Sequence, residues 1–358
     1  MFNTEENNSS RAVRVLISVA AIVIIIAGIS LAQSVVVLLL FSFFLALLGT
    51  PPVLWLQEKH IPSGFAVLIV MAVMIVILLL ISVQLGSSFS GFIDELPLLQ
   101  SRIREQVLEL SAYLRSKGFS GTQKLLLDYV KPEVLLKLTA NLLTGLSSVL
   151  SDLVLILLTV TFILLEVSSF PIKLRAVLGD PEQVFPHFTK FAYDMKRYMV
   201  IKTFMSLASG ILIAVWLYIL GVDYPILWGF LAFLLNYIPN IGSIVAAIPA
   251  VILAIIQLGF GSGVLVAAGY IVINFAEGNV IEPRLMGRKL GLSTLVVFLS
   301  LIFWGGLLGF VGAILAIPLT MTLKFAFENS ESTKWIAILL GSEKIDELPA
   351  SIRSKKKK

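Results

Sequence analysis

The chain has 358 residues, of which 58% are hydrophobic and 14% charged; its net charge is +5 and its mean hydropathy is +0.98. Because a soluble core cannot bury so much apolar surface, the composition predicts an all-α, polytopic membrane protein. The chain has no cysteine, which excludes disulfides and thiolate chemistry, and its two histidines lie in polar stretches, so we expect no metal and no cofactor.

Residues 1–90 are expected to hold transmembrane helices 1–3. The first apolar run ends at residues 30–32, whose sequence Ser-Leu-Ala is similar to a signal-peptidase site. A second apolar run, 35–48, follows at once, so we expect the first to be retained as a membrane helix. The third run, 64–85, is long enough to cross about 30 Å of hydrocarbon.

Residues 91–137 change character and are expected to lie on the extracytoplasmic side. They carry seven Lys/Arg and six Asp/Glu, and their apolar side chains recur at three- and four-residue spacing, which predicts an amphipathic helix. The apolar stripe consists of Leu96, Leu99, Ile103, Val107, Leu110 and Leu114. Two interpretations are open for it, namely packing within the subunit and contact between subunits.

Transmembrane helix 4 is expected at residues 138–166, and a cytoplasmic helical loop with an excess of Lys and Arg follows at 167–200. Alternation from a cytoplasmic N-terminus places the charge-balanced segment 91–137 outside and this cationic loop inside, in agreement with the positive-inside rule. The basic tail, 328–358, is expected to be cytoplasmic as well. Its charge fits anionic lipid and not a nucleic-acid surface.

Residues 201–327 are expected to form the transport core, and the sequence NYIPN, 236–240, interrupts the apolar run within it. The segment 225–258 has 34 residues, about 51 Å as one helix, which is too long for one span and too short for two with a turn. We therefore predict a re-entrant hairpin with its tip at NYIPN. Irregular backbone at that depth needs protein or water around it, so the break predicts a polar cavity.

A second interruption occurs in the segment 292–323, where the sequence Trp304-Gly305-Gly306 is expected to break the helix. One span, 264–281, separates the two segments, so they would enter from opposite faces. Paired interrupted segments in inverted orientation are typical of the solute site of secondary transporters. The alternative is a pair of kinked helices that pack tightly through glycine.

Two carboxylates lie inside predicted membrane helices, where a charge needs water, a partner or a proton. Asp152 is a candidate for coupling; the alternatives are a protonated acid bonded to a neighbouring helix, or a helix that begins outside the membrane. Glu277 shares a helix face with Asn274, and both are expected to line the cavity at NYIPN. The alternative for Glu277 is an ion pair with Arg284 or Arg288 at the cytoplasmic boundary.

The candidate residues fall into two groups. For solute binding we propose Asn236, Tyr237, Pro239, Asn240, Gly242, Asn274, Trp304, Gly305 and Gly306. For coupling or gating we propose Asp152, Glu277, Asn279, Glu282 and Arg284. We expect Pro283 to end the preceding helix, and Glu282 to form a local ion pair with Arg284.

Other classes of protein lack support in the sequence. No phosphate-binding loop of the form G-x-x-x-x-G-K-[ST] occurs, no H-E-x-x-H motif occurs, and the Gly-Ser-Gly at 261–263 is not a nucleophile elbow. We therefore expect neither a primary pump nor an enzyme. A passive oligomeric channel remains an alternative to a carrier.

Three stretches carry a resemblance to a known family: LLTVTFILLEV at 157–167, NYIPNIGSIVAAIP at 236–249, and the run from Gly278 to Thr320. They are similar to the autoinducer-2 exporter family of bacterial inner-membrane proteins, and most similar to its quorum-signal branch. The resemblance implies about eight membrane segments, a homo-oligomer (a pentamer), and export of a small, uncharged, hydroxylated furanone. The family also includes sodium or lithium/proton antiporters, so the resemblance leaves the substrate open.

Overall fold

The computed structural model describes most of the chain, and every element in the described residues is helical, which confirms the all-α fold class. Within the part of the chain that the structure describes, six helices are long and apolar enough to cross a membrane, and three shorter apolar helices accompany them. The described residues are 3–116, 152–167, 169–179, 188–239, 241–286, 291–330 and 333–341.

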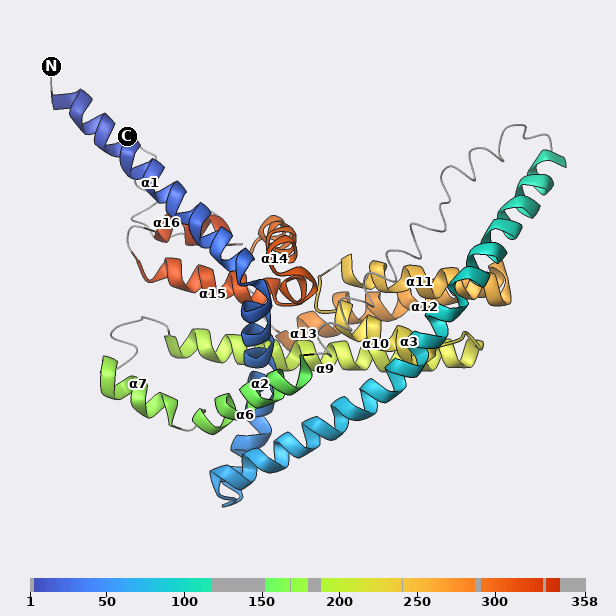
Figure 1. Cartoon of the computed structure of the whole chain (residues 1–358), viewed down its shortest axis with the longest axis horizontal. Coiled ribbons are helices and arrows are strands. Elements are labelled where there is room, and N and C mark those ends of the chain that lie inside the picture. The colour runs from blue at the N-terminus through green and yellow to red at the C-terminus, as the bar shows by residue number, and fades with distance from the viewer. Residues whose placement is uncertain are drawn as a thin grey trace.

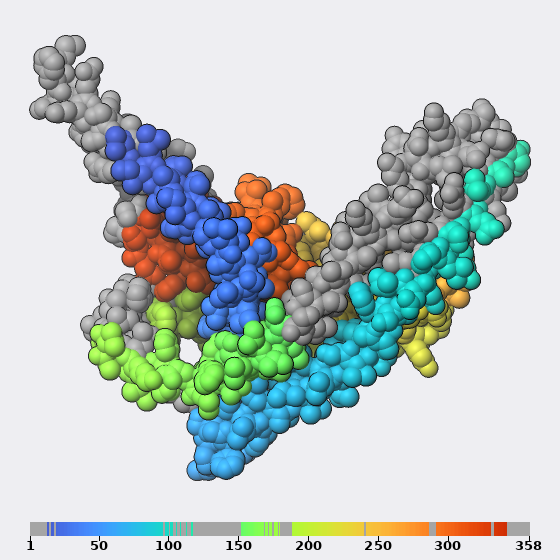
Figure 2. Space-filling view, in the orientation of Figure 1, coloured from blue at the N-terminus to red at the C-terminus, as the bar shows by residue number. Residues whose placement is uncertain are grey.

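The N-terminal part consists of three long helices: α1 (Asn3–Leu31), α2 (Gln33–Glu58) and α3 (Ser63–Ser116). In Figures 1 and 2, α1 points away from the C-terminal helices, whereas α3 runs past α10 and α11 and packs against them; α2 runs across α9. Because α3 is a single helix of 54 residues, the predicted border between 1–90 and 91–137 falls inside it. Leu99 of the predicted apolar stripe is buried, while residues 117–137 lie outside the described part.

Two short helices follow, α6 (Leu153–Glu166) and α7 (Phe170–Leu178). Helix α6 packs on α2 and α3, and its buried side chains Ile156, Val160 and Leu164 lie one turn apart on one face. Of the span predicted at 138–166, only the part from Asp152 onward is described.

The C-terminal part is organised around α9 (Phe188–Leu220), which lies beside α10 (Pro225–Leu235), α12 (Phe260–Ala276) and α13 (Glu282–Met286). The outward face of α12 carries Ile271, Val272 and Phe275, all more than 60% exposed, as expected for a helix in contact with lipid. Helices α9 and α10 cross at Gly210 and Gly229: a Cβ on Gly210 would stand 2.7 Å from the Gly229 carbonyl oxygen. Only glycine permits this close approach.

The first interrupted segment is broken where the sequence predicts. Helix α10 ends at Leu235, and a turn forms the tip of the segment. Helix α11 (Ile241–Leu258) then runs back and packs against α10. Gly242 closes the turn against Leu235, whose carbonyl oxygen leaves no room for a side chain. Residues 225–258 therefore form a helical hairpin.

The second interrupted segment is also broken, but at a different residue. It consists of α14 (Thr294–Ile314) and α15 (Ala316–Glu328), followed by the short α16 (Lys334–Leu340). The prediction that Trp304-Gly305-Gly306 breaks the helix is wrong, since the non-helical residue inside α14 is Gly309, with φ 66° and ψ −147°. Glycine is tolerated within a helix, and only a backbone in this conformation requires it.

The tips of the two hairpins share buried contacts. One hydrophobic core contains Trp228, Leu231 and Leu235 of the first hairpin, and a second contains Tyr237 together with Val311. Phe310, next to the break at Gly309, packs against both cores. The fold therefore brings the two interruptions of the chain together beside α9.

Candidate functional site

A π-helical turn, η1 (Glu277–Ile281), joins α12 to α13. The backbone N–H of Glu282 donates to the carbonyl oxygen of Glu277, five residues earlier. In an α-helix, the side chains of two residues five positions apart point in directions that differ by about 140° around the helix axis. The wider π turn reduces this angle, so the two side chains lie closer to one face. Pro283 does not end the helix as predicted: it lies in the first turn of α13, where its missing N–H costs little, and the helix continues to Met286.

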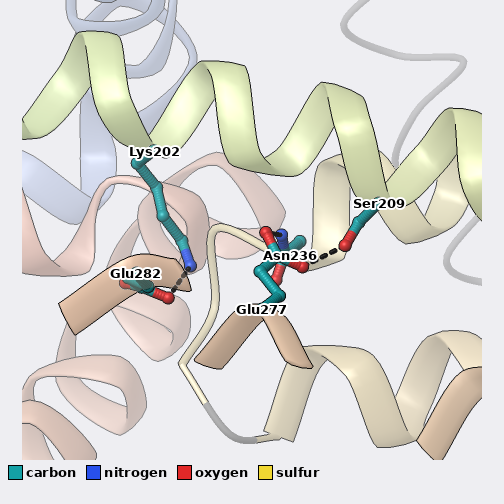
Figure 3. A network of polar contacts seen from close by, with 5 residues as sticks. All are labelled: Lys202, Ser209, Asn236, Glu277 and Glu282. Atoms are coloured by element: carbon teal, nitrogen blue, oxygen red, sulfur yellow. Dashed lines mark hydrogen bonds and ion pairs between the residues drawn. The ribbon is translucent and has the colours of Figure 1, made fainter. Parts of the chain in front are cut away.

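Glu277 is buried, with only 4% of its surface exposed, and its two carboxyl oxygens are bonded by two other elements. Ser209 Oγ, from α9, donates to Oε2, and Asn236 Nδ2, from the tip of the first hairpin, donates to Oε1 over 2.8 Å (Figure 3). Both donors are neutral. The carboxyl group thus ties together α9, the hairpin tip and the π turn.

A second contact between the same elements lies beside it. Lys202 Nζ, on α9, pairs with Glu282 Oε2 at 3.3 Å, and the two side chains are 5% and 26% exposed (Figure 3). The predicted local ion pair between Glu282 and Arg284 is therefore replaced by a pair across helices, and the side chain of Arg284 is exposed. The alternative ion pair of Glu277 with Arg284 is likewise not formed among the described residues, where the carboxyl group bonds to Ser209 and Asn236, and the other proposed partner, Arg288, lies outside the described residues.

Tyr237, the second residue of the hairpin tip, is buried and oriented by its neighbours. Its hydroxyl donates to Thr203 Oγ1 over 2.7 Å, and its ring makes edge-to-face contacts with Phe44 and Phe233. Such contacts fix an aromatic ring in place. At the same tip Pro239 is half-buried and Gly242 is buried, while Asn240 lies outside the described residues.

Several predicted site residues bond elsewhere. Asn274 donates to Tyr270 O and the exposed Asn279 to Phe275 O, both within their own helix. Trp304 Nε1 donates to Thr320 Oγ1, across the second hairpin, over 3.1 Å. Gly305 and Gly306 lie beside Trp304 in α14, and Asp152 is exposed just before α6. The backbone N–H of Glu277 donates to Asn274 O, but among the described residues none of these side chains bonds to the Glu277 carboxyl group, and their proposed roles stay predictions.

The polar face of α9 was not predicted from the sequence. Lys202, Ser206 and Ser209 are buried and lie four and three residues apart, hence on one face of the helix. Lys202 lies just after the cationic loop 167–200, so its charge fits a cytoplasmic boundary as well as a polar helix face. The spacing of these polar residues within one apolar helix is the sequence signal that indicates such a buried polar face.

Comparison with known proteins identifies the family. The profile described as AI-2E family transporter matches residues 19–332. The chain belongs to this transporter family. The AI-2 transport protein TqsA of Escherichia coli K12 is 39% identical over 327 residues, which cover 91% of the chain and 95% of TqsA. This AI-2E family transporter is also similar to the putative transport protein YhhT of the same strain, at 35% identity over 91% of the chain and 94% of YhhT.

A putative transport protein of Haemophilus influenzae is 37% identical over 92% of the chain and 96% of its own length. The family and these relatives are transporters, which confirms both the predicted resemblance and the expectation that the chain is not an enzyme. With its several long apolar helices, this AI-2E family transporter is a multi-pass membrane protein.

Proposed function

We propose that the protein exports a small polar signalling molecule of the autoinducer-2 type from the bacterial cytoplasm, as a secondary transporter. The observation that carries this proposal is the buried group of Glu277, Asn236 and Ser209 at the tip of a broken hairpin. TqsA, whose name records AI-2 transport, supports the choice of solute.

The free-energy cost of placing a carboxyl group in a membrane supports a functional role for Glu277 and its two partners. A carboxylate at the centre of a membrane costs about 2.5 to 3.5 kcal/mol on insertion scales, and a purely structural contact does not need one. Amide, hydroxyl and carboxyl groups offer donors and acceptors at close spacing. A neutral molecule with several hydroxyl groups matches such a site, because it forms many modest hydrogen bonds and brings no charge of its own.

The proposal also includes the membrane location, the orientation and the assembly of the protein. The protein lies in the bacterial inner membrane with both termini in the cytoplasm, as the cationic loop 167–200 and the basic tail favour. It works as a homo-oligomer, which the family resemblance suggests is a pentamer. Solute is exchanged beside the two hairpin tips, which meet in the two hydrophobic cores around Phe310.

The test is a flux measurement with the purified protein in liposomes. Vesicles loaded with the autoinducer-2 furanone should release it faster with protein than without, and the rate should saturate as the internal furanone concentration rises. Saturation distinguishes a carrier from a passive channel, whose flux would rise in proportion to concentration. Release equal to that of protein-free vesicles would contradict the proposal.

A second candidate function is sodium/proton antiport, which the buried carboxyl group of Glu277 favours. In the same vesicles an imposed sodium gradient would then move protons, and Glu277→Gln would abolish that movement. Under the furanone-export proposal, dissipating the sodium gradient leaves furanone release unchanged. A sodium-driven pH change in the absence of furanone transport would select the antiporter.

A further inference from the structure

Ser206, on α9, is a fully buried residue whose hydroxyl has no protein partner. Its exposed fraction is 0%, and Ser206 Oγ is one of two buried side-chain oxygens without a hydrogen bond among the described residues; the other is Tyr270 OH. Buried hydroxyl groups are bonded in the large majority of cases, so an exception calls for a physical explanation.

The exception is unusual within this protein too. Serine and threonine in a helix commonly return their hydroxyl hydrogen to the carbonyl one turn earlier, as Thr203 does to Met199 O and Thr161 does to Leu157 O. Ser206 makes no such bond to Lys202 O. Its hydroxyl is therefore available to a partner, and helical spacing places Ser206 on the face of α9 that carries Lys202 and Ser209.

The surroundings of Ser206 restrict that partner. Lys202 lies one turn before it and is paired with Glu282, and Ser209 lies almost one turn after it and is bonded to Glu277 (Figure 3). The ammonium group of Lys202 is already paired with Glu282, and the Glu277 carboxyl group disfavours an anionic solute here. The hydroxyl of Ser206 carries no charge, so it matches a neutral solute that donates or accepts one hydrogen bond.

We propose that Ser206 is a specificity-determining residue of the transport site, and that its hydroxyl forms a hydrogen bond with a hydroxyl group of the neutral solute in transit. This inference rests on the proposed function and deepens it, because it names the residue that selects hydroxyl-bearing solutes. Ser209 and Asn236 hold the Glu277 carboxyl group in position, while Ser206 contacts the solute.

The first experiment compares Ser206→Ala with the wild type in liposomes and in thermal unfolding. Removal of the hydroxyl should raise KM for the furanone about tenfold, since one hydrogen bond to solute is lost. The unliganded variant should be as stable as the wild type or more stable, because an unsatisfied buried group has been removed. In contrast, Ser209→Ala, which removes one of the two donors to the buried Glu277 carboxyl group, should lower the unfolding temperature. An unchanged KM for Ser206→Ala would overturn the inference.

The second experiment uses the absence of cysteine from the chain, so that one introduced thiol is the only one present. Ser206→Cys should react with a small, water-soluble methanethiosulfonate, and a hydroxylated solute should slow the reaction. The matched control is Ile213→Cys, on the same helix and packed in a hydrophobic core at 1% exposure, which should remain unreactive.

This labelling separates the inference from the proposed function. Slowing by the furanone supports both, whereas slowing by glycerol or ribose but not by the furanone supports the role of Ser206 and contradicts autoinducer-2 as the solute. Labelling no faster than that of Ile213→Cys, or labelling that none of the three solutes slows, overturns the inference whatever the vesicles transport.

Discussion

Asn236 Nδ2 donates to Glu277 Oε1 over 2.8 Å, and this bond joins the tip of the first hairpin to a π turn 41 residues later in the chain. The bond forms between two irregular pieces of backbone inside an otherwise apolar bundle. Any movement of the hairpin tip relative to α12 breaks it. Solute binding at this pair would therefore be linked to movement of the hairpin tip relative to α12.

The Glu277 carboxyl group is expected to stabilise the protein as well as to serve transport. Glu277→Ala leaves the amide of Asn236 and the hydroxyl of Ser209 without their acceptor, which should lower the free energy of unfolding by about 3 kcal/mol. Glu277→Gln retains an acceptor oxygen and should lose less. Thermal unfolding in detergent checks this order, and equal stability of the two variants would contradict the bonding that the structure shows.

The crossing of α9 and α10 is expected to tolerate no side chain. In Gly210→Ala the new Cβ would meet the Gly229 carbonyl oxygen at 2.7 Å and Phe233 Cβ at 2.8 Å, so the helices must separate. Since Ser209 is adjacent, we expect both a lower unfolding temperature and reduced flux. The control is Gly261→Ala in α12, where no atom lies within 4 Å of the new Cβ and no change is expected.

The break in the second hairpin is expected to depend on one glycine. Gly309→Ala places a Cβ on a residue with φ 66° and ψ −147°, a conformation that costs other residues about 1–3 kcal/mol. We therefore expect a loss of stability of that size, measured by chemical or thermal unfolding. Gly306→Ala is the matched control, since that position is helical and open, and a loss as large in Gly306→Ala would argue against a specific role for Gly309.

The ion pair between α9 and α13 is expected to behave as a unit. Glu282→Gln leaves the ammonium group of Lys202 buried without its counter-charge, which should cost about 3 kcal/mol. Lys202→Met in the same chain removes that charge and should restore much of the stability. A double-mutant cycle on unfolding free energies measures the coupling, and additive effects would show that the two side chains do not interact.

The two hairpins differed in how well the sequence located them. In the first, proline and two asparagines occur together in an apolar run, and no continuous membrane helix accommodates that combination, so both the break and its position were predictable. In the second, the adjacent glycines Gly305 and Gly306 indicated a break that the structure has at Gly309, because glycine is also found within helices. The backbone angles of Gly309 depend on the packing of the returning arm, which the sequence pattern does not express.

Some residues of the site were predictable from the sequence, but the contacts between them were not. Glu277 and Asn236 were singled out because a carboxyl group and an amide are costly in hydrocarbon, and the structure brings them into contact. The π turn leaves no signature in residue type, so the pairing of Glu282 with Lys202 in place of Arg284 was not predictable. Ser206 and Ser209 were missed since each serine alone is unremarkable in a membrane helix.

The measurement that tests the central proposal most directly is furanone efflux from liposomes that contain Asn236→Ala, beside wild type and Asn329→Ala. Asn329, whose amide bonds only to Phe325 O in the structure, is a matched asparagine away from the hairpin tips. We expect Asn236→Ala to lower the efflux rate at least about tenfold, through loss of the bond that positions the Glu277 carboxyl group at the site, with protein level and oligomeric state unchanged. Efflux by Asn236→Ala at the rate of the wild type and of Asn329→Ala would contradict the assignment of the hairpin tip as the transport site.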